Sequence, residues 1–433
     1  MTATLAPVAA LLLSVAMLLM GNGLQGTLLP VRAQFEHFSP LDIGVLGSAY
    51  FLGFALGCVF GPHAVRRVGH IRAFAAMVSI ASTISLAHAL LLSPAVWWVL
   101  RAGTGFCFAA LYMVIESWLN EKATNETRGL VFSVYTIVNL TVITIGQMML
   151  TFDSPLAFSL FALSSILVSL AAVPVALTSA EAPEPPAIVR IRPRYLYRIS
   201  PVGFVGCFAV GLANSCFWSL GPIFAQREEG DVTAIAVFMS LTVIAGAAGQ
   251  WPLGRASDHM DRRKVIVFAC VGGALAGVGL MMASQFWAQG LLLFAGLFGF
   301  FAFPLYALCA AHMNDFVEPD GYVEAASGLL LVFGAGAVLG PILASALMRF
   351  YGGDALFGFT AFVHMSTAAF ALYRMRQRAR PPEEERVEFA DAIRMAQTIS
   401  AFDPMSRKAE GDRAAEPAAA PPAGEGDRSR ETD

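Results

Sequence analysis

Long apolar runs alternate with short polar segments along most of this chain. A helix rises 1.5 Å per residue, so about 20 mostly apolar residues suffice to cross a hydrocarbon layer about 30 Å thick. The pattern predicts twelve such helices, at 6–29, 41–62, 73–93, 95–118, 129–151, 155–177, 201–224, 233–254, 265–284, 286–311, 323–347 and 355–374. We therefore predict an all-α integral membrane protein.

Basic residues are unevenly divided between the two sets of connecting loops. If both termini lie in the cytoplasm, the inner loops and the start of the tail hold seventeen Lys and Arg residues, and the outer loops hold three. Cytoplasmic loops are the ones enriched in Lys and Arg. We therefore predict cytoplasmic termini. The first apolar run has no Lys or Arg before it and no small-residue cleavage site after it, so we interpret it as a retained span.

The segment TSAEAPEPPAIVRIRPRYLYRIS, between the sixth and seventh runs, is rich in Pro and Arg. It is too polar to span a membrane and, by its composition, too irregular for a helix. The sequence thus predicts four parts: an N-terminal six-helix bundle at 1–177, a cytoplasmic linker at 178–200, a C-terminal six-helix bundle at 201–375 and a disordered cytoplasmic tail at 376–433.

Within the tail, the segment VEFADAIRMAQTIS has a weakly amphipathic pattern. It places Phe389, Ile393 and Ala396 on one face of a helix. Such a helix could lie on the membrane surface, and plain disorder is the alternative.

The two halves resemble each other in sequence, with a shift of 192 residues. This shift aligns four pairs: Asn22 with Asn214, Pro30 with Pro222, Ser48 with Ser240 and Gly57 with Gly249. One or two more residues of shift align Gly103 with Gly296 and Gly146 with Gly340. The shared register indicates an internal repeat, and therefore two pseudo-symmetric bundles.

Composition agrees with a membrane protein and argues against several other classes. The chain is 57% hydrophobic and 14% charged, with a mean hydropathy of +0.64 and a net charge of -3, whereas soluble domains carry about 25% charged residues. The six Cys residues lie in apolar runs without a CxxC or Cys/His pattern, so we expect neither a metal site nor disulfides. No cluster of nucleophile and base is visible, and we expect no enzyme activity and no cofactor.

Related polar segments follow the second span of each half, GPHAVRRVGHIR at 61–72 and GRASDHMDRRKV at 254–265. The fourth span contains R-x-x-x-G, from Arg101 to Gly105, and is followed by an E-x6-R pattern of Glu121 and Arg128. Together with the twelve spans and the repeat, these motifs resemble the major facilitator superfamily, whose loop motif is roughly G-x-x-x-D-R-x-G-R-R/K.

The second copy of the loop motif keeps Gly254, Asp258 and Arg262, whereas the first, aligned on Gly69, has Arg66 where the family has Asp. In this first copy Arg67 takes the place of the motif's first Arg. The resemblance covers about residues 6 to 374 and implies a secondary transporter of the bacterial inner membrane. In this fold two bundles rock about a site near the membrane midplane.

Two ionisable residues lie within the predicted spans, where a charge is costly and therefore a functional candidate. Arg101 is about 9 Å from the outer end of the fourth span at 1.5 Å per residue. In the family the matching Arg is linked to proton coupling; alternatively, Arg101 extends outward and only holds the helix in place. Glu116, near the inner end of the same helix, could take up a proton or could bind a loop Arg as a static strut.

Polar residues within the spans are candidates for the substrate cavity. Asn22 and Asn214 occupy matching positions in the first and seventh helices, which line the central cavity in the resembling fold; each could instead bond a neighbouring helix. Further candidates are Gln25, Tyr112, Tyr135, Asn139, Gln147 and Trp218. We interpret His88 and His364 as structural.

Loop charges predict a cytoplasmic gate. The 2–3 loop carries Arg66, Arg67 and Arg72 without an acid, and the 10–11 loop carries the acids Asp315, Glu318, Asp320 and Glu324 without a Lys or Arg. In the resembling fold these loops meet across the boundary between the bundles. Across the other boundary, Asp258 would face the start of the fifth helix near Arg128. The alternative is that the basic residues only set topology, and we accept this for Arg72 and Lys264.

We therefore predict a secondary active transporter for a small polar or anionic solute, with proton coupling left open. No phosphate-binding GxxxxGK[ST] loop is present, which argues against direct ATP drive. The alternatives are a multidrug or metabolite efflux carrier, and a non-transporting membrane sensor on the same fold. Expected partners are the lipid bilayer, a small-molecule substrate and, if coupling holds, protons; we expect a monomer and no nucleic acid.

Overall fold

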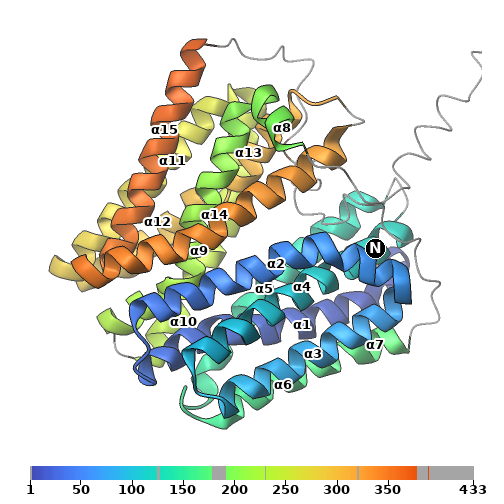
Figure 1. Cartoon of the computed structure of the whole chain (residues 1–433). Helices are drawn as coiled ribbons and strands as arrows, with labels where there is room; N and C mark the ends of the chain where they lie inside the picture. The colour runs from blue at the N-terminus through green and yellow to red at the C-terminus, as the bar shows by residue number, and fades with distance from the viewer. Residues whose placement is uncertain are drawn as a thin grey trace, which may run out of the picture.

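The computed structural model describes residues 2–123, 127–177, 192–229, 231–318, 321–377 and 389. These residues form helices connected by short turns (Figure 1). The first half comprises α1 (Thr2–Phe35), α2 (Pro40–Val68), α3 (His70–Leu90), α4 (Pro94–Lys122), α5 (Arg128–Met148), η1 (Met149–Phe152), α6 (Phe158–Leu170) and α7 (Ala172–Ala176). The short helix α8 (Pro193–Ile199) follows. The second half comprises α9 (Pro201–Glu229), α10 (Val232–His259), α11 (Arg262–Phe286), η2 (Ala288–Gly290), α12 (Leu291–Ala302), α13 (Leu305–Asn314), α14 (Tyr322–Tyr351) and α15 (Ala355–Gln377).

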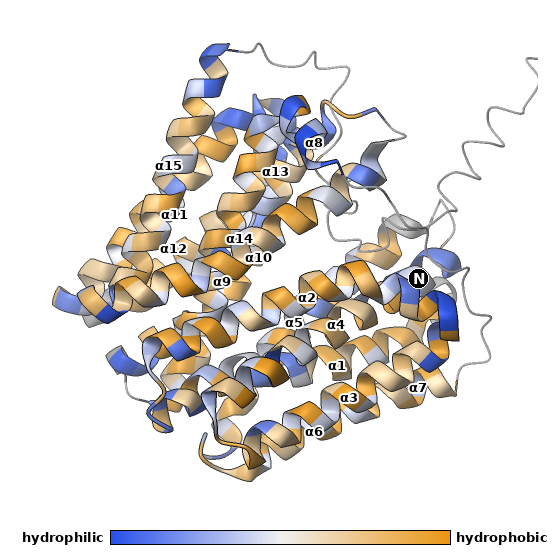
Figure 2. Ribbon diagram, viewed as in Figure 1, coloured by the Kyte–Doolittle hydropathy of each residue, from blue (hydrophilic) through white to orange (hydrophobic). Residues whose placement is uncertain are grey.

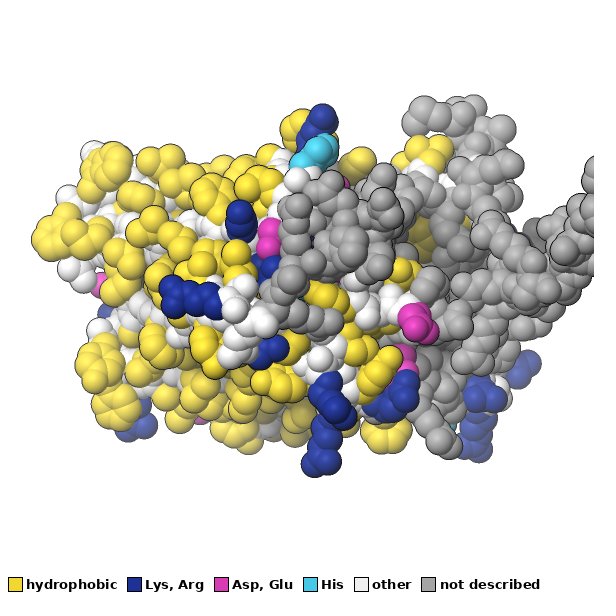
Figure 3. Space-filling view, turned by 90° about the horizontal axis from the view of Figure 1, so that it is seen from above, with side chains coloured by type: hydrophobic (Ala, Val, Ile, Leu, Met, Phe, Trp, Pro, Cys, Tyr) yellow, Lys and Arg dark blue, Asp and Glu magenta, His cyan; other side chains and the backbone are white. Residues whose placement is uncertain are grey.

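Twelve helical spans in the described part of the chain are long and apolar enough to cross a membrane, which confirms the predicted number. Orange, hydrophobic positions run along the helices, and blue positions gather at their ends (Figure 2). Hydrophobic side chains also cover much of the face shown in Figure 3, with Lys and Arg scattered among them. The chain is therefore a multi-pass membrane protein.

Local chemistry explains where several helices begin and end. Ser39 caps α2 in a reciprocal capping box with Asp42, and Pro40 occupies the first turn, where its missing N–H costs nothing. Gly69 alone separates α2 from α3 and has a φ of 83°, a conformation that favours glycine. The conspicuous glycine of GPHAVRRVGHIR thus makes the tight turn between the two helices.

The helices pair in the same way in each half. In the first half α1 packs on α5, α2 on α4 and α3 on α6; in the second half α9 packs on α14, α10 on α12 and α11 on α15. Between the halves, α2 contacts α14 and α5 contacts α10, and these two pairs correspond under the repeat. The fold is therefore the predicted pair of pseudo-symmetric six-helix bundles.

Close backbone contacts confirm the register of the repeat. A Cβ added at Gly146 of α5 would meet the carbonyl oxygen of Met20 in α1, and one added at Gly340 of α14 would meet that of Leu212 in α9. Met20 and Leu212 are 192 residues apart, which is the shift found in the sequence. In both halves glycine lets two helix backbones approach where any side chain would keep them apart.

Three local details differ from the sequence-based expectations. The segment judged too irregular for a helix ends in α8, which begins with Pro193 at its first position and buries Leu196. The tenth span is divided at Phe303 and Pro304 into α12 and α13. The last span continues to Gln377, and the rest of the predicted tail lies outside the described residues except for Phe389.

Candidate functional site

A cavity of about 200 Å³ lies between the two halves. Four helices of the first half and α9 of the second contribute to its wall: α1, α2, α4, α5 and α9. The polar lining residues are Asn22, Thr27, Tyr50, Arg101, Gln147, Trp218 and Ser219. No acidic residue is among the described residues that line it. We call this space the central cavity.

Arg101 supplies the positive charge of the central cavity. Its guanidinium carbon lies 4.4 Å from the centre of the Tyr50 ring, an arrangement in which the ring face attracts the cation. Arg101 Nη1 also donates a hydrogen bond of 3.4 Å to Gln25 Oε1. Thus α4, α2 and α1 together hold the guanidinium against the cavity, and it does not extend away into solvent as a mere helix anchor would.

Amide side chains around the cavity have unused hydrogen-bonding capacity. Within the described residues, Asn22 Oδ1, Gln25 Nε2 and Gln147 Oε1 are buried without a hydrogen-bond partner. Buried polar groups are ordinarily paired, because leaving one unpaired costs about 1–3 kcal/mol. Asn22 and Gln147 line the cavity, so a solute there could pair with their unpaired oxygens, whereas Gln25 is not in the lining and contacts the cavity through Arg101.

Glu116 belongs to a separate polar group inside the first bundle. The Tyr135 hydroxyl donates a 3.3 Å hydrogen bond to Glu116 Oε1, and only 2% of Glu116 is exposed. Tyr112 packs in the same cluster as Tyr135, and Asn139 Oδ1 has no hydrogen-bond partner among the described residues. None of these four residues is in the lining of the central cavity.

The halves fit closely at one end of the molecule. Helices α2, α4 and α10 begin at the same end of the molecule (Pro40, Pro94 and Val232), which we call the far face. They finish at the opposite end (Val68, Lys122 and His259), which we call the tail face. Near the far face, a Cβ on Gly44 would collide with Ser345 of α14, and a Cβ on Gly47 with Ser219 of α9. There is thus no passage between these helices at this end.

Toward the tail face the two halves diverge. The helix ends of the first half point to the right in Figure 1, and those of the second half point upward. The contact between α2 and α14 extends from the Gly44–Ser345 pair to a small void beside Cys58 and Leu330, about 21 Å along α2 at 1.5 Å per residue. The remainder of α2 ends with the exposed side chains Val59, Phe60, Arg66 and Arg67.

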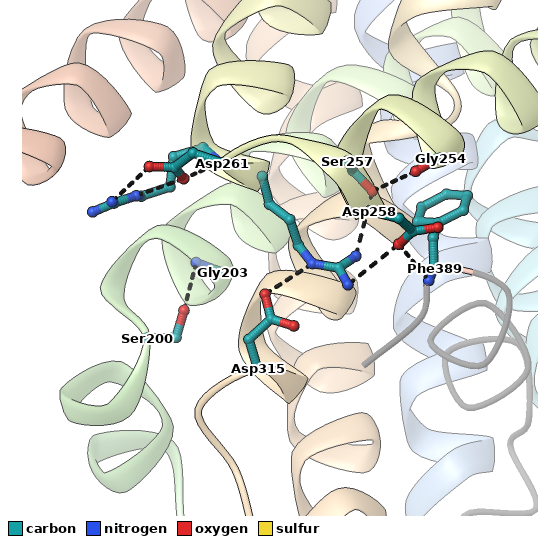
Figure 4. A network of polar contacts seen from close by, with 10 residues as sticks. Ser200, Gly203, Gly254, Ser257, Asp258, Asp261, Asp315 and Phe389 are labelled. Atoms are coloured by element: carbon teal, nitrogen blue, oxygen red, sulfur yellow. Dashed lines mark hydrogen bonds and ion pairs between the residues drawn. The ribbon is translucent and has the colours of Figure 1, made fainter. Parts of the chain in front are cut away.

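At the tail face, a buried ion cluster joins three helices of the second half (Figure 4). Arg262 Nε lies 2.8 Å from Asp315 Oδ2, and the two side chains are 1% and 2% exposed. Arg262 Nη2 lies 3.5 Å from Asp258 Oδ1, and Arg262 Nη1 lies 3.4 Å from Ser257 Oγ. The second loop motif therefore ties α10, α11 and α13 together.

Asp261 begins α11 next to this cluster. Burial raises the pKa of its carboxyl group. Hydrogen bonds from the side chain and backbone N–H of Arg263, together with the charge of Arg263, lower the pKa by more, so the net shift is downward. The carboxylate also caps the helix by accepting from Arg263 N–H. An acid at the motif's second Gly position is thus explained by helix capping.

Phe389 of the tail packs against the same motif. Its backbone N–H donates a 2.8 Å hydrogen bond to Asp258 Oδ1, and its ring occupies the space that a side chain at Gly254 would need. Phe389 is 5% exposed and therefore contacts protein and not a membrane surface. Ile393 and Ala396, predicted to share its face, lie outside the described residues.

The predicted gate residues are divided between several places. Gly254, Asp258, Arg262 and Asp315 come together as described, all within the second half. Glu324 forms an ion pair of 2.7 Å with Arg192, which precedes α8. Arg66, Arg67 and Glu121 are exposed, no ion pair between Arg66 or Arg67 and an acid occurs among the described residues, and the side chain of Arg128 is not described.

The cavity candidates are also divided. Asn22, Arg101, Gln147 and Trp218 line the central cavity, and Gln25 contacts it through Arg101. Asn214 has an unpaired Oδ1 like Asn22 but is not in the lining. Sequence reasoning missed Thr27, Tyr50 and Ser219; a signal for Tyr50 was its position one turn after Gly47, on the face of α2 that glycines mark as closely packed.

The sequence of this chain matches the family model of the Major Facilitator Superfamily at residues 11–313 and 203–402. An uncharacterized MFS-type transporter YcaD of Escherichia fergusonii is 25% identical over 382 residues, which cover 87% of this chain and 97% of the relative. A similar transporter of Enterobacter sp. (strain 638) is 26% identical over 358 residues, covering 81% and 91%.

Solved structures share the fold at low sequence identity. The nucleoside transporter NupG superimposes with a TM-score of 0.72 and 13% identity, covering 86% of this chain and 99% of NupG. A D-xylose-proton symporter gives a TM-score of 0.65 and 13% identity, covering 84% and 96%. At these identities the likeness concerns the fold alone.

Proposed function

The chain belongs to the Major Facilitator Superfamily, and from this premise we propose that it is a secondary transporter that moves a small polar or anionic solute by alternating access. The moving bodies are the bundles at 1–177 and 201–375, joined by the linker at 178–200. The carrier works as a monomer in the bacterial inner membrane, with its tail face and both termini in the cytoplasm.

The observation that carries this proposal is the central cavity between the halves, closed by tight packing at the far face. Gly44 and Gly47 bring α2 against α14 and α9 at that end, while the halves diverge at the other. The repeat relates this contact to the one between α5 and α10. A rocking motion about the cavity would exchange which face is packed.

Export of cationic drugs is the weaker alternative. Such a solute calls for a negative partner in the cavity, and the described lining offers Arg101 instead. A buried cation repels another cation strongly in a medium of low dielectric constant. The charge of the cavity therefore favours a neutral or anionic solute.

Proton coupling is a second feature of the proposal, and the buried Glu116 supports it. We expect Glu116→Gln to keep the hydrogen bond from Tyr135, since an amide oxygen can accept it, but to lose the ability to bind a proton. Accumulation driven by a proton gradient should then fall at least tenfold, while exchange of solute across the membrane without a gradient continues. Equal loss of both activities would instead identify Glu116 as a strut.

Counterflow tests the transport function directly. The purified protein is reconstituted in proteoliposomes loaded with a metabolite mixture, and exchange with an isotope-labelled external mixture is followed by mass spectrometry. We expect one solute or a small related set to exchange above protein-free liposomes, and Arg101→Gln to change that exchange. A folded protein that exchanges nothing would favour the membrane sensor.

A further inference from the structure

We propose that the central cavity binds a small organic monocarboxylate, with its carboxylate at Arg101, which Gln25 holds in place, and its apolar part against the hydrophobic lining. This inference rests on the proposed transport function and specifies the class of solute. It depends on three properties of the cavity, which are its charge, its unpaired donors and acceptors, and its size and lining.

The charge of the cavity is a single positive one without a counter-ion. In the described part of the chain no acid forms an ion pair with Arg101, and its contacts are the Tyr50 ring and Gln25 Oε1. A cation held within a membrane protein without a carboxylate is costly. One bound anion would neutralise it, whereas a dianion would leave an excess negative charge, which favours a monoanion.

The donors are suitable for a carboxylate. Arg101 has N–H groups beyond the one that Gln25 accepts, and a guanidinium can donate two parallel hydrogen bonds to a carboxylate. Gln25 accepts that one through Oε1 and holds the guanidinium in place, although Gln25 itself is not in the lining. The remaining N–H groups of Arg101 could satisfy both oxygens of one carboxylate.

The rest of the cavity suits a small and partly apolar molecule. Its volume of about 200 Å³ is below the range of about 300–1,000 Å³ usual for drug-sized ligands. Hydrophobic lining is provided by Leu29, Ile43, Leu46, Phe51 and Ile143, and by the ring of Trp218. Gln147, 1% exposed and with Oε1 unpaired, lines the same space and could bond one further polar group on the solute.

Three planar probes of nearly the same shape test this class, namely benzoate, benzamide and benzamidine, which are anionic, neutral and cationic. Binding is measured as the shift in thermal unfolding of the purified full-length protein and as uptake of labelled probe into proteoliposomes. A ligand that binds the folded state raises the unfolding temperature, and at a fixed ligand concentration the rise grows with the logarithm of its affinity. We expect stabilisation and uptake with benzoate, at least tenfold weaker binding of benzamide, and none of benzamidine.

Variants link the effect to the cavity. We expect Arg101→Gln to weaken benzoate binding at least tenfold, Arg101→Lys to weaken it less because the charge remains, and Gln25→Leu to weaken it about threefold. Arg349→Gln is the matched control, because Arg349 is exposed at the far-face end of α14 and its loss should leave binding unchanged.

The proposal is overturned if benzamide or benzamidine binds as tightly as benzoate, or if benzoate does not stabilise the folded protein. It is also overturned if a folded Arg101→Gln protein binds benzoate normally. Counterflow separates this failure from that of the transport function: exchange of a neutral or cationic solute would refute the carboxylate alone, whereas no exchange of any solute would refute the carrier.

Discussion

Single residues show how far a sequence can locate a site. The sequence identifies Arg101 and Glu116 because each is a charged residue within an apolar run. In the structure each side chain has polar or aromatic partners that stabilise its charge. Their partners, Tyr50 and Tyr135, come from other helices, so no spacing within α4 could have revealed them. The sequence located the charges but not the contacts that decide their chemistry.

The two asparagines aligned by the repeat provide a matched test at this scale. Asn22 lines the central cavity, whereas Asn214 does not, although both have an unpaired Oδ1. A hydrogen bond to a solute is worth about 0.5–1.5 kcal/mol, or about two- to tenfold in affinity. We expect Asn22→Ala to raise the half-saturating solute concentration in counterflow by that factor and Asn214→Ala to leave it within twofold. A larger effect at Asn214 would contradict this assignment.

At the scale of helices, glycine positions explain most of what could be predicted. The repeat includes glycines in register, and four of them mark points where helix backbones touch, namely Gly57, Gly146, Gly249 and Gly340, whereas Gly103 and Gly296 meet only side chains. The glycine of R-x-x-x-G marks another such point, since a Cβ at Gly105 would meet the carbonyl oxygen of Tyr50. Two features could not be predicted in this way. Helix α8 is stabilised by packing on the second half. The contact of Phe389 with Gly254 joins residues 135 positions apart in the sequence.

This packing predicts a large effect of a single methyl group. Gly105→Ala pushes α4 away from the α2 backbone, and overpacking of this kind costs about 1–3 kcal/mol. Gly26→Ala is the control, because a Cβ at Gly26 of α1 meets nothing within 4 Å, and alanine favours the helix by about 0.5–1 kcal/mol. Thermal unfolding in detergent should show a lower midpoint for Gly105→Ala and an equal or higher one for Gly26→Ala. Equal midpoints for both variants would show that α2 and α4 can separate freely.

For the whole molecule, the sequence predicted the twelve helices, their pairing into two bundles and the membrane setting, because each depends on apolar length and on the repeat. It could not show which face is packed, since the same residues must serve both states of a rocking carrier. The charges at the tail face illustrate this. Asp315 was expected to face Arg66 and Arg67, but it is paired with Arg262 within its own half, and Glu324 is paired with Arg192.

The gate remains a prediction for the state in which the tail face is closed, and the structure indicates which acid would take part. Helices α2 and α14 lie side by side, so closure would bring Arg66 and Arg67 toward Glu324 at the start of α14. The Asp315 carboxylate is 2% exposed and is not free to leave Arg262 at low cost. Arg192, whose side chain is 62% exposed in its pair with Glu324, can be replaced more easily.

Charge reversal tests this gate. In Arg66→Glu/Arg67→Glu, two acids would face Glu324, so the closed tail face should be disfavoured. Because exposed pairs are worth about 0–1 kcal/mol each, two such pairs contribute at most about 2 kcal/mol, and we expect at most about a thirtyfold shift between the two states. A Gly26→Cys reporter in the central cavity, labelled from either side of oriented vesicles, measures that shift against a low background, since the six native cysteines are buried.

The double variant should be labelled faster from the tail face, and adding Glu324→Arg should restore the original rate, because the charges are then opposite again. Arg72→Glu is the matched control: Arg72 is exposed at the start of α3 and is expected only to influence topology, so its reversal should not change labelling. If the reporter in Arg66→Glu/Arg67→Glu is labelled at the same rate as in the protein with both arginines, the basic residues act only on membrane orientation. The closed state would then depend on apolar packing between α2 and α14, as the far face does in this structure.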